Sequence, residues 1–443
     1  KTEMIMVTGY SGIGKSALVK EIYQPITRHK GYFLTGKFDQ FQRNVPYSAV
    51  VKALSGLVRQ LLSESELHNW KQKLLSAIQP NAQIIIDVIP EVELIIGKQP
   101  TVEELSGSEA QNRFNSVFKS FIRILCQQEH PLVLFLDDLQ WADSASLQLI
   151  ELMMKDEQMH HLLLIGSYRD NEVDAAHPLN ILLERLEVDA SINQIHLTSL
   201  NIDNITNLIA DTLNREIDHV KPLAKLVSDK TAGNPFFVNQ FIHNLYSEKL
   251  IYFYTSQGGK KPRWEWDIAQ IEAMDITDNV IDLMISKLIY LPLSTQKVLR
   301  LAACFGNRFN LNTLAVVSEL SLTDAFQHMA VAIKLGFILP TSEFDFVDAN
   351  ILDSQLVIYN FKFLHDKVQQ AAYSLIAEYE KQSVHLQIGW LLYSSFSAQD
   401  RVEHIFELVD HFNIGRELII DDNEKLELVK LNLSAAKKAK DAI

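Results

Sequence analysis

An eight-residue loop near the start of the chain has the residue types that bind a phosphate group. Residues 9–16 read GYSGIGKS, which fits the pattern G-x-x-x-x-G-K-[ST]. Glycines let successive backbone N–H groups converge on phosphate oxygens, and the helix that follows adds its positive N-terminus. Lys15 is predicted to reach the β and γ phosphates of ATP, and the Ser16 hydroxyl to ligate Mg²⁺. The other loop positions expected to contact the nucleotide are Gly9, Ser11, Gly12, Ile13, Gly14 and Ala17.

Two adjacent carboxylates follow a second apolar segment, Leu132–Leu136. In phosphoryl transfer, one acid at the end of a strand anchors Mg²⁺, and a neighbour can polarise the attacking water. We assign Asp137 to the metal, mainly through its water shell, and Asp138 to the general base. The alternative is an ordinary acidic turn before a helix that Asp143 caps with its side chain.

A basic residue follows a third apolar segment, Leu162–Ser167. If this strand lies beside the strand that precedes the loop, Arg169 is placed to contact the γ phosphate. We therefore predict that Arg169 senses the third phosphate during catalysis. The alternative is a surface ion pair between Arg169 and either Asp170 or Glu172.

The elements that position these residues read as an α/β P-loop NTPase over residues 1–198. Evenly apolar segments separated by helical patterns predict a parallel sheet covered on both faces, a three-layer α/β/α fold. A long helical insertion is expected between the second and third strands, from Tyr47 to Gln127. The predicted strands are Met4–Thr8, Gly31–Thr35, Leu132–Leu136, Leu162–Ser167 and Gln194–Leu197.

The remainder of the chain is mainly helical in pattern. We predict a helical lid domain with a β-hairpin at 199–290, the hairpin turning at Ser256–Gly259. A winged-helix domain is predicted at 291–382, with an extended pair at 337–340 and 358–363. The start of TPR-like helical repeats is predicted at 383–443. The repeat helices are expected at 384–396, 401–412 and 424–442.

Composition is that of a globular protein, with 47% hydrophobic and 22% charged residues. Net charge is −14, from 41 Lys and Arg against 55 Asp and Glu, which argues against a broad nucleic-acid face. No apolar run reaches the roughly 18 residues of a membrane span, and residues 1–6 lack the long apolar core of a secretion signal. We expect a cytoplasmic protein without membrane contact, whose Cys126 and Cys304 are reduced core thiols. We also expect the chain to be a piece of a longer protein.

These elements, in this order, resemble the STAND class of signal-transduction ATPases, which are relatives of the AAA+ proteins. The likeness is greatest to the predicted-ATPase module of large bacterial proteins that also carry serine/threonine kinase, GAF and histidine kinase domains. The strings that support it are 7–16, 36–41, 135–146 and 231–237.

The resemblance implies two further nucleotide contacts. Its glycine-x-proline motif maps to Gly233-Asn234-Pro235 and implies that Pro235 packs against the adenine. A proline at the first position of a helix is by itself a sufficient structural explanation. Phe363-Leu364-His365-Asp366 is similar to the Met-His-Asp motif of plant resistance proteins, which implies that His365 contacts the β phosphate of ADP. The alternative is that His365 is a capping or packing residue.

The function implied is a slowly hydrolysing switch that is closed with ADP and open with ATP. It would regulate kinase or other effector domains of the same longer polypeptide, and any kinase chemistry would lie outside this chain. A protein partner could bind the helical repeats. One alternative is a mechanical, ring-forming AAA+ ATPase, and another is a non-enzymatic scaffold that retains ADP. A transcription factor is disfavoured, because residues 321–335 contain only His328 and Lys334 as candidate cations.

Overall fold

The computed structural model describes most of the chain and divides it into two compact units. The first unit is residues 1–197 with 405–409 and 426–443, and the second is residues 198–404 with 410–425. Each unit is described by itself below. The described residues are 2–39, 46–62, 67–103, 105, 107–187, 192–255, 262–273, 287–341 and 360–441.

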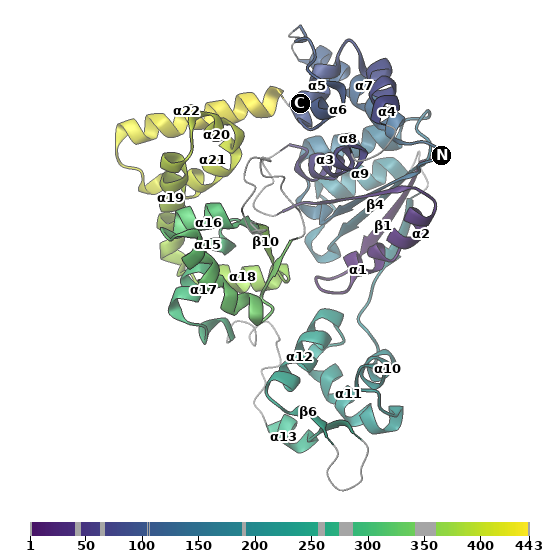
Figure 1. Ribbon diagram of the computed structural model, residues 1–443, viewed down its shortest axis with the longest axis vertical. Coiled ribbons are helices and arrows are strands. Elements are labelled where there is room, and N and C mark those ends of the chain that lie inside the picture. Colours follow the sequence, from purple (N-terminus) through teal and green to yellow (C-terminus); the bar gives the residue numbers. More distant parts are fainter. Residues whose placement is uncertain are drawn as a thin grey trace. The chain divides into compact units, whose positions relative to one another are not determined.

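The first unit is built on a five-stranded sheet in the order β2-β3-β4-β1-β5. Strands β1 and β4 of this sheet are labelled in Figure 1. All four neighbouring pairs are parallel, which confirms the sheet predicted from the apolar segments. The P-loop strand β1 therefore lies between β4 and β5, and β3 lies one strand further away. The strands are β1 (Glu3–Thr8), β2 (Tyr32–Lys37), β3 (Leu132–Asp137), β4 (Leu162–Tyr168) and β5 (Ile192–His196).

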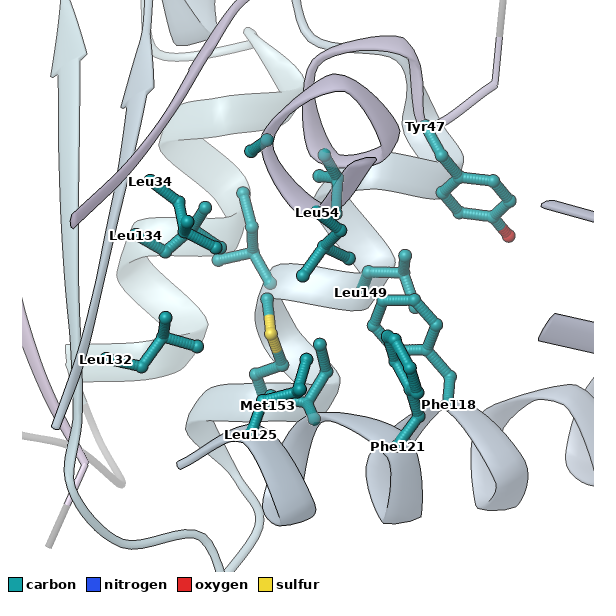
Figure 2. Close-up of a cluster of buried hydrophobic side chains, with 14 of the residues drawn as sticks. Leu34, Tyr47, Leu54, Phe118, Phe121, Leu125, Leu132, Leu134, Leu149 and Met153 are labelled. Carbon is teal, nitrogen blue, oxygen red and sulfur yellow. The ribbon is translucent and has the colours of Figure 1, made fainter. Parts of the chain in front are cut away.

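Both faces of this sheet are covered because side chains alternate along each strand. Leu132 and Leu134 of β3 join the larger core with helices that include α3 (Ser48–Leu62) and α7 (Ser108–Leu125), as Figure 2 shows. Val133 and Phe135 point to the other face. There they pack with residues of α1 (Lys15–Lys20) and α2 (Tyr23–Arg28), which cover that side of the sheet.

Other helices of the first unit fill the predicted insertion and flank β4. Within the insertion the helices are interrupted at residues 79–81, near Pro90 and at 97–100. The insertion adds α4 (Leu67–Ile78), α5 (Ala82–Val88) and α6 (Val92–Ile96). Flanking β4 are α8 (Ser144–Met154), α9 (Pro178–Glu187) and the short 3₁₀ helices η1 (Leu139–Trp141) and η2 (Asp170–Glu172).

The second unit begins with a helical group that has its own core. Strands β6 (Ile251–Tyr254) and β7 (Arg263–Trp266) pair antiparallel; the predicted turn at 256–259 lies outside the described residues. Helix α11 (Ile217–Thr231) extends on the N-terminal side of Pro222, because its first turns bury Val220 in this core. The other helices are α10 (Ile202–Leu213), α12 (Pro235–Ser247) and α13 (Ile268–Ala273).

Three helices and a small antiparallel sheet follow, where the sequence predicts a winged helix. The sheet order is β8-β10-β9, and its strand β8 (Arg308–Asn310) is too short to produce a sequence periodicity. The predicted extended residues 358 and 359 lie outside the described residues, and the strand there starts at Asn360. The other elements are α15 (Leu293–Ala303), α16 (Leu311–Ser318), α17 (Leu322–Lys334), β9 (Ile338–Pro340) and β10 (Asn360–Phe363).

The C-terminal region is helical, as predicted. The helix expected at 401–412 is divided in two at His404, whose φ of −96° and ψ of 23° are not helical. The elements are α18 (Asp366–Ser374), α19 (Glu378–Ser395), α20 (Ala398–Glu403), α21 (Ile405–Ile414) and α22 (Asp422–Asp441). Among the helices of the described ranges, none combines the length and the apolar character needed to cross a membrane.

Two histidines meet in the interior of the second unit. His385 Nδ1 lies 2.8 Å from His411 Nδ1, and the Tyr373 hydroxyl lies 3.0 Å from His385 Nε2. The Phe305 ring packs edge-on against His411. Burial, with a smaller contribution from Lys381, holds the pKa of His385 at about 4. Burial, with a smaller contribution from His385, holds the pKa of His411 at about 3.

This pair is expected to make the chain acid-sensitive. Both imidazoles stay neutral in the folded state, whereas in the unfolded chain they take up protons near the ordinary pKa of 6.5. The unfolded state therefore binds more protons below pH 6.5, and the free energy of unfolding falls as pH falls. Between pH 7.5 and pH 5 we expect each histidine to remove about 2 kcal/mol. Urea denaturation at both pH values measures this loss.

Two variants isolate the contribution of the pair. His411→Phe should lower stability at pH 7.5 and reduce the loss between pH 7.5 and pH 5, because one titrating group is gone. His29→Gln, at an exposed position, serves as the control and should leave the loss as it is in the parent chain. An equal acid loss in parent and His411→Phe would show that the buried pair does not cause it.

Candidate nucleotide-binding site

The glycine loop has the backbone geometry of a phosphate cradle. Gly9 has φ +137°, and a Cβ there would lie 2.6 Å from the Leu197 carbonyl oxygen, so no larger residue fits. Gly14 has φ +102° and is the N-cap of α1, without a side-chain capping bond. The first N–H groups of a helix have no partner within the helix, so at α1 they can receive an anion. The cradle therefore fits a phosphate group.

Lys15 lies folded across this loop. Its Nζ donates to the carbonyl oxygens of Gly9, at 2.7 Å, and Tyr10, at 3.0 Å. The side chain is buried, and burial is the main cause that lowers the pKa of Lys15 below its ordinary value. Burial disfavours the charged form of Lys15. A phosphate in the loop would place negative charge beside the ammonium group and stabilise that form.

Asp137 ends strand β3 between two hydroxyl groups. The Ser16 hydroxyl donates to Asp137 Oδ2 at 2.8 Å, and the Ser167 hydroxyl donates to Asp137 Oδ1. Burial and the neighbouring Asp138 raise the pKa of Asp137, and Lys37 and the two hydroxyls oppose that rise. The fold thus brings together the hydroxyl and the carboxylate that the sequence predicts as metal ligands.

These two oxygen ligands fit Mg²⁺, which takes few protein ligands and completes its shell with phosphates and water. Across the described ranges, no group of three or more His, Cys, Asp and Glu side chains can hold a metal ion. A metal at Ser16 and Asp137 would therefore depend on the nucleotide phosphates. A bound cation would also favour the ionised form of Asp137.

Asp138 is buried and paired with two cations. Lys37 Nζ lies 3.0 Å from Asp138 Oδ2, and Arg169 Nε lies 3.5 Å from Asp138 Oδ1. The Gln140 amide donates to Asp138 Oδ1 at 2.9 Å. The backbone of Asp138 is left-handed, with φ 59°, which turns the chain sharply between β3 and η1. The alternative cap is also present, since Asp143 accepts from the Ser146 N–H at 2.8 Å.

Arg169 follows β4 and is buried rather than on the surface. Its guanidinium lies 4.6 Å from the centre of the Trp141 ring and pairs with Glu172 at 2.8 Å. The alternative ion pair to Glu172 is thus present, but it occupies an interior position next to Asp138. A contact from Arg169 to the γ phosphate remains a prediction.

Sequence reasoning missed three residues of this cluster: Lys37, Gln140 and Ser167. Each lies at or just after the carboxyl end of β2, β3 or β4, where ligands of parallel sheets bind. Lys37 pairs in register with Asp137 across β2 and β3, and this pairing depends on the strand order. A polar residue ending an apolar strand segment was the available signal for Lys37 and Ser167.

The second unit carries the two residues assigned by resemblance. Pro235 is the first residue of α12, and Asn234 caps that helix by accepting from the Phe236 N–H at 3.1 Å. His365 caps α18, with Nδ1 accepting from the Lys367 N–H at 3.1 Å. The Phe236 ring stacks on the His365 ring with centres 4.1 Å apart. The capping role of His365 is therefore present, and nucleotide contacts of Pro235 and His365 remain predictions.

The parallel sheet, the glycine loop entering α1 and the carboxylate at the end of β3 define a P-loop NTPase fold. Residues 1–165 match the family model described as an AAA ATPase domain. This segment is thus similar to AAA ATPase domains, which agrees with the resemblance drawn from the motifs.

Three relatives are histidine kinases by name. Hybrid signal transduction histidine kinase G of Dictyostelium discoideum is 31% identical over 541 residues, covering 99% of this chain and 15% of the relative. Peroxide stress-activated histidine kinase mak3 of Schizosaccharomyces pombe is 22% identical, covering 96% of this chain and 19% of the relative. Histidine protein kinase 1 of Candida albicans is 21% identical, covering 83% and 18%. The chain thus spans less than a fifth of these relatives, and none of them is the bacterial serine/threonine kinase protein that the resemblance implied.

Solved structures show a more distant likeness. A STAND protein with a tetratricopeptide repeat sensor from Pyrococcus horikoshii aligns over 99% of this chain and 52% of its own, at 11% identity and TM-score 0.46. Cdc6p from Pyrobaculum aerophilum aligns over 90% of this chain and 89% of its own, at 10% identity and TM-score 0.34. Likeness at this level says nothing about function.

Proposed function

We propose that this chain is a nucleotide-controlled switch that binds ATP or ADP with Mg²⁺ and hydrolyses ATP slowly. The observation that carries the proposal is one cluster in the first unit. There Lys15, Ser16, Asp137, Asp138 and Arg169 lie at or just after the carboxyl ends of three neighbouring strands, β1, β3 and β4.

Each residue of the cluster has a role that its contacts support. Lys15 would bind the β and γ phosphates, and Ser16 with Asp137 would hold Mg²⁺. The metal ion supplies positive charge against the charge that develops on the transferred phosphoryl group. Asp138 would accept a proton from the attacking water, and Arg169 would contact the γ phosphate.

The pairing of Asp138 supports slow rather than fast hydrolysis. Lys37 and Arg169 both lie against its carboxylate, and Gln140 donates to one of the same oxygens. Both oxygens of the Asp138 carboxylate therefore already face a partner. These partners must loosen before Asp138 can act as a base, which suits a switch better than a rapid mechanical ATPase.

The residues of the second unit would read the nucleotide state. Pro235 would pack on the adenine and His365 would contact the β phosphate of ADP. Phe236, next to Pro235 in the chain, stacks on His365 and so ties the two candidate contacts together. Reversing a 1:99 equilibrium takes about 5.5 kcal/mol of differential affinity, so domain interfaces must add to these contacts.

The output of the switch would lie in other parts of a longer polypeptide. Relatives named as histidine kinases support attached kinase or effector domains, whose chemistry would reside outside this chain. We place the protein in the cytoplasm, with the C-terminal helices available to a protein partner. The net charge of −14 supports a role without nucleic acid.

The test of this proposal is the nucleotide that the purified chain retains. Denaturing the protein and separating the supernatant by ion-exchange chromatography should release about one ADP per chain. Multiple-turnover hydrolysis should be slow and its rate per chain independent of protein concentration. A rate that rises steeply with concentration would favour the ring-forming ATPase, and ADP without any turnover would favour the scaffold.

The contact of His365 with ADP gives a further prediction. His365→Asn keeps a good helix cap at α18 but lacks the reach and the ring of histidine. We expect it to speed ADP release about 10-fold or more, the value of one hydrogen bond to a charged group. Stopped-flow displacement of a fluorescent ADP analogue measures the rate, with Phe253→Leu, an exposed aromatic of β6, as control. An unchanged release rate would leave His365 as a capping residue only.

A further inference from the structure

Gln140 is a buried amide that joins the two strands carrying the candidate catalytic residues. It is 2% exposed and lies in η1, just after β3. Its Nε2 donates to Asp138 Oδ1 at 2.9 Å, and its Oε1 accepts from the Arg169 N–H at 3.2 Å. Its own carbonyl oxygen lies 3.2 Å from His177 Nε2, which holds the backbone of η1 in place.

The orientation of this amide follows from the chemistry of its partners. A backbone N–H can only donate, so the oxygen of Gln140 must face Arg169. An ionised carboxylate can only accept, so the amide nitrogen must face Asp138. Both ends of the side chain are thus used, and neither partner can be satisfied if the amide is reversed. The ring of the next residue, Trp141, packs against the Arg169 guanidinium.

We infer that Gln140 is a positioning residue that couples Asp138 to Arg169. Any movement of the Arg169 backbone just after β4 would be transmitted through the amide to the carboxylate. The same bond restricts Asp138 Oδ1, so the other oxygen, next to Lys37, is the one that faces the attacking water. This inference rests on the proposed function, because it assumes that Asp138 takes part in hydrolysis.

Two substitutions separate the two hydrogen bonds. Gln140→Glu keeps the acceptor for the Arg169 N–H but places a carboxylate against Asp138, and Gln140→Met keeps the volume and loses both bonds. We expect single-turnover hydrolysis of bound ATP to fall about 10- to 100-fold in both variants. The Kd for ATP should change by less than about 3-fold, because the phosphate loop is untouched. Gln148→Glu, an exposed position on α8, is the matched charge control.

A double variant tests whether Gln140 acts through Asp138. In Asp138→Asn/Gln140→Glu the amide and the acid exchange places, so the hydrogen bond can re-form with the opposite polarity. If Gln140 only positions Asp138, the rate of the double variant should equal that of Asp138→Asn alone. A residue that acts independently of Asp138 would instead lower the rate of the double variant by the product of the two single-variant effects.

The outcomes distinguish this inference from the proposed function. If Asp138→Asn hydrolyses ATP like the parent, or the parent does not hydrolyse ATP at all, the proposed function fails. If Asp138→Asn is inactive but the Gln140 variants retain the parent rate, the inference alone is overturned. It is also overturned if the Gln140 variants lose ATP binding together with thermal stability.

Discussion

Replacing Lys15 with methionine is expected to abolish the retention of nucleotide by the purified chain. The ammonium group would bridge two phosphates, and charge-assisted bonds of that kind are worth about 1.5–3 kcal/mol each. Losing both raises the Kd for ATP and ADP by roughly 10²- to 10⁴-fold. Titration with a fluorescent ATP analogue measures the change, and chromatography of the denatured protein shows whether ADP is still carried.

The fold should survive this substitution. Methionine retains most of the apolar stem, and burial already lowers the pKa of Lys15, so the charge contributes little to folding. Lys20→Met, at an exposed position at the end of α1, should bind nucleotide like the parent chain. If Lys15→Met still carried nucleotide at the parent level, the glycine loop would not be the binding site.

Replacing Asp138 with asparagine is expected to separate binding from hydrolysis. The amide is isosteric with the carboxylate but cannot accept the proton of the attacking water. General bases contribute about 10²- to 10⁴-fold, and we expect the single-turnover rate to fall within that range. ATP affinity should stay within a few-fold, because Lys15, Ser16 and Asp137 remain in place. Quenched-flow measurement of phosphate release with protein in excess gives the rate.

Asp143→Asn is the matched control for this experiment. Asp143 follows in the same segment, but its side chain caps α8 by accepting from the Ser146 N–H, a role that asparagine also fills. That variant should hydrolyse ATP at the parent rate. A parent-like rate in Asp138→Asn would remove its role as the base and would point to water activation by another group.

The parallel sheet was predictable because burial on both faces leaves a local mark in the sequence. A strand such as Leu132–Leu136 is apolar at every position, and helical segments separate it in the sequence from the preceding and following strands. Short or irregular elements left no such mark. Strand β8 has three residues, and α11 continues on the N-terminal side of Pro222 because burial of Val220 outweighs the local signal.

The candidate site was predictable only in part. The glycine loop is contiguous, and its chemistry follows from spacing alone, so Lys15 and Ser16 could be assigned directly. Lys37 and Ser167 could not, because their closeness to Asp137 and Asp138 depends on which strands are neighbours. Gln140 lies near Asp138 in the chain, but its second partner, the Arg169 N–H, comes from another strand.

The sequence by itself determined that residues 9–16 form a glycine loop between a strand and a helix, and it predicts phosphate binding there because such a site is built from adjacent backbone groups. It also determined which carboxylates end an apolar strand. Only the tertiary structure decided that Asp138 is neutralised by Lys37 and Arg169 and linked through Gln140 to β4. Ion pairs and buried amides join residues about 30 to 100 positions apart, and the order of strands in the sheet, rather than spacing along the chain, brings them together.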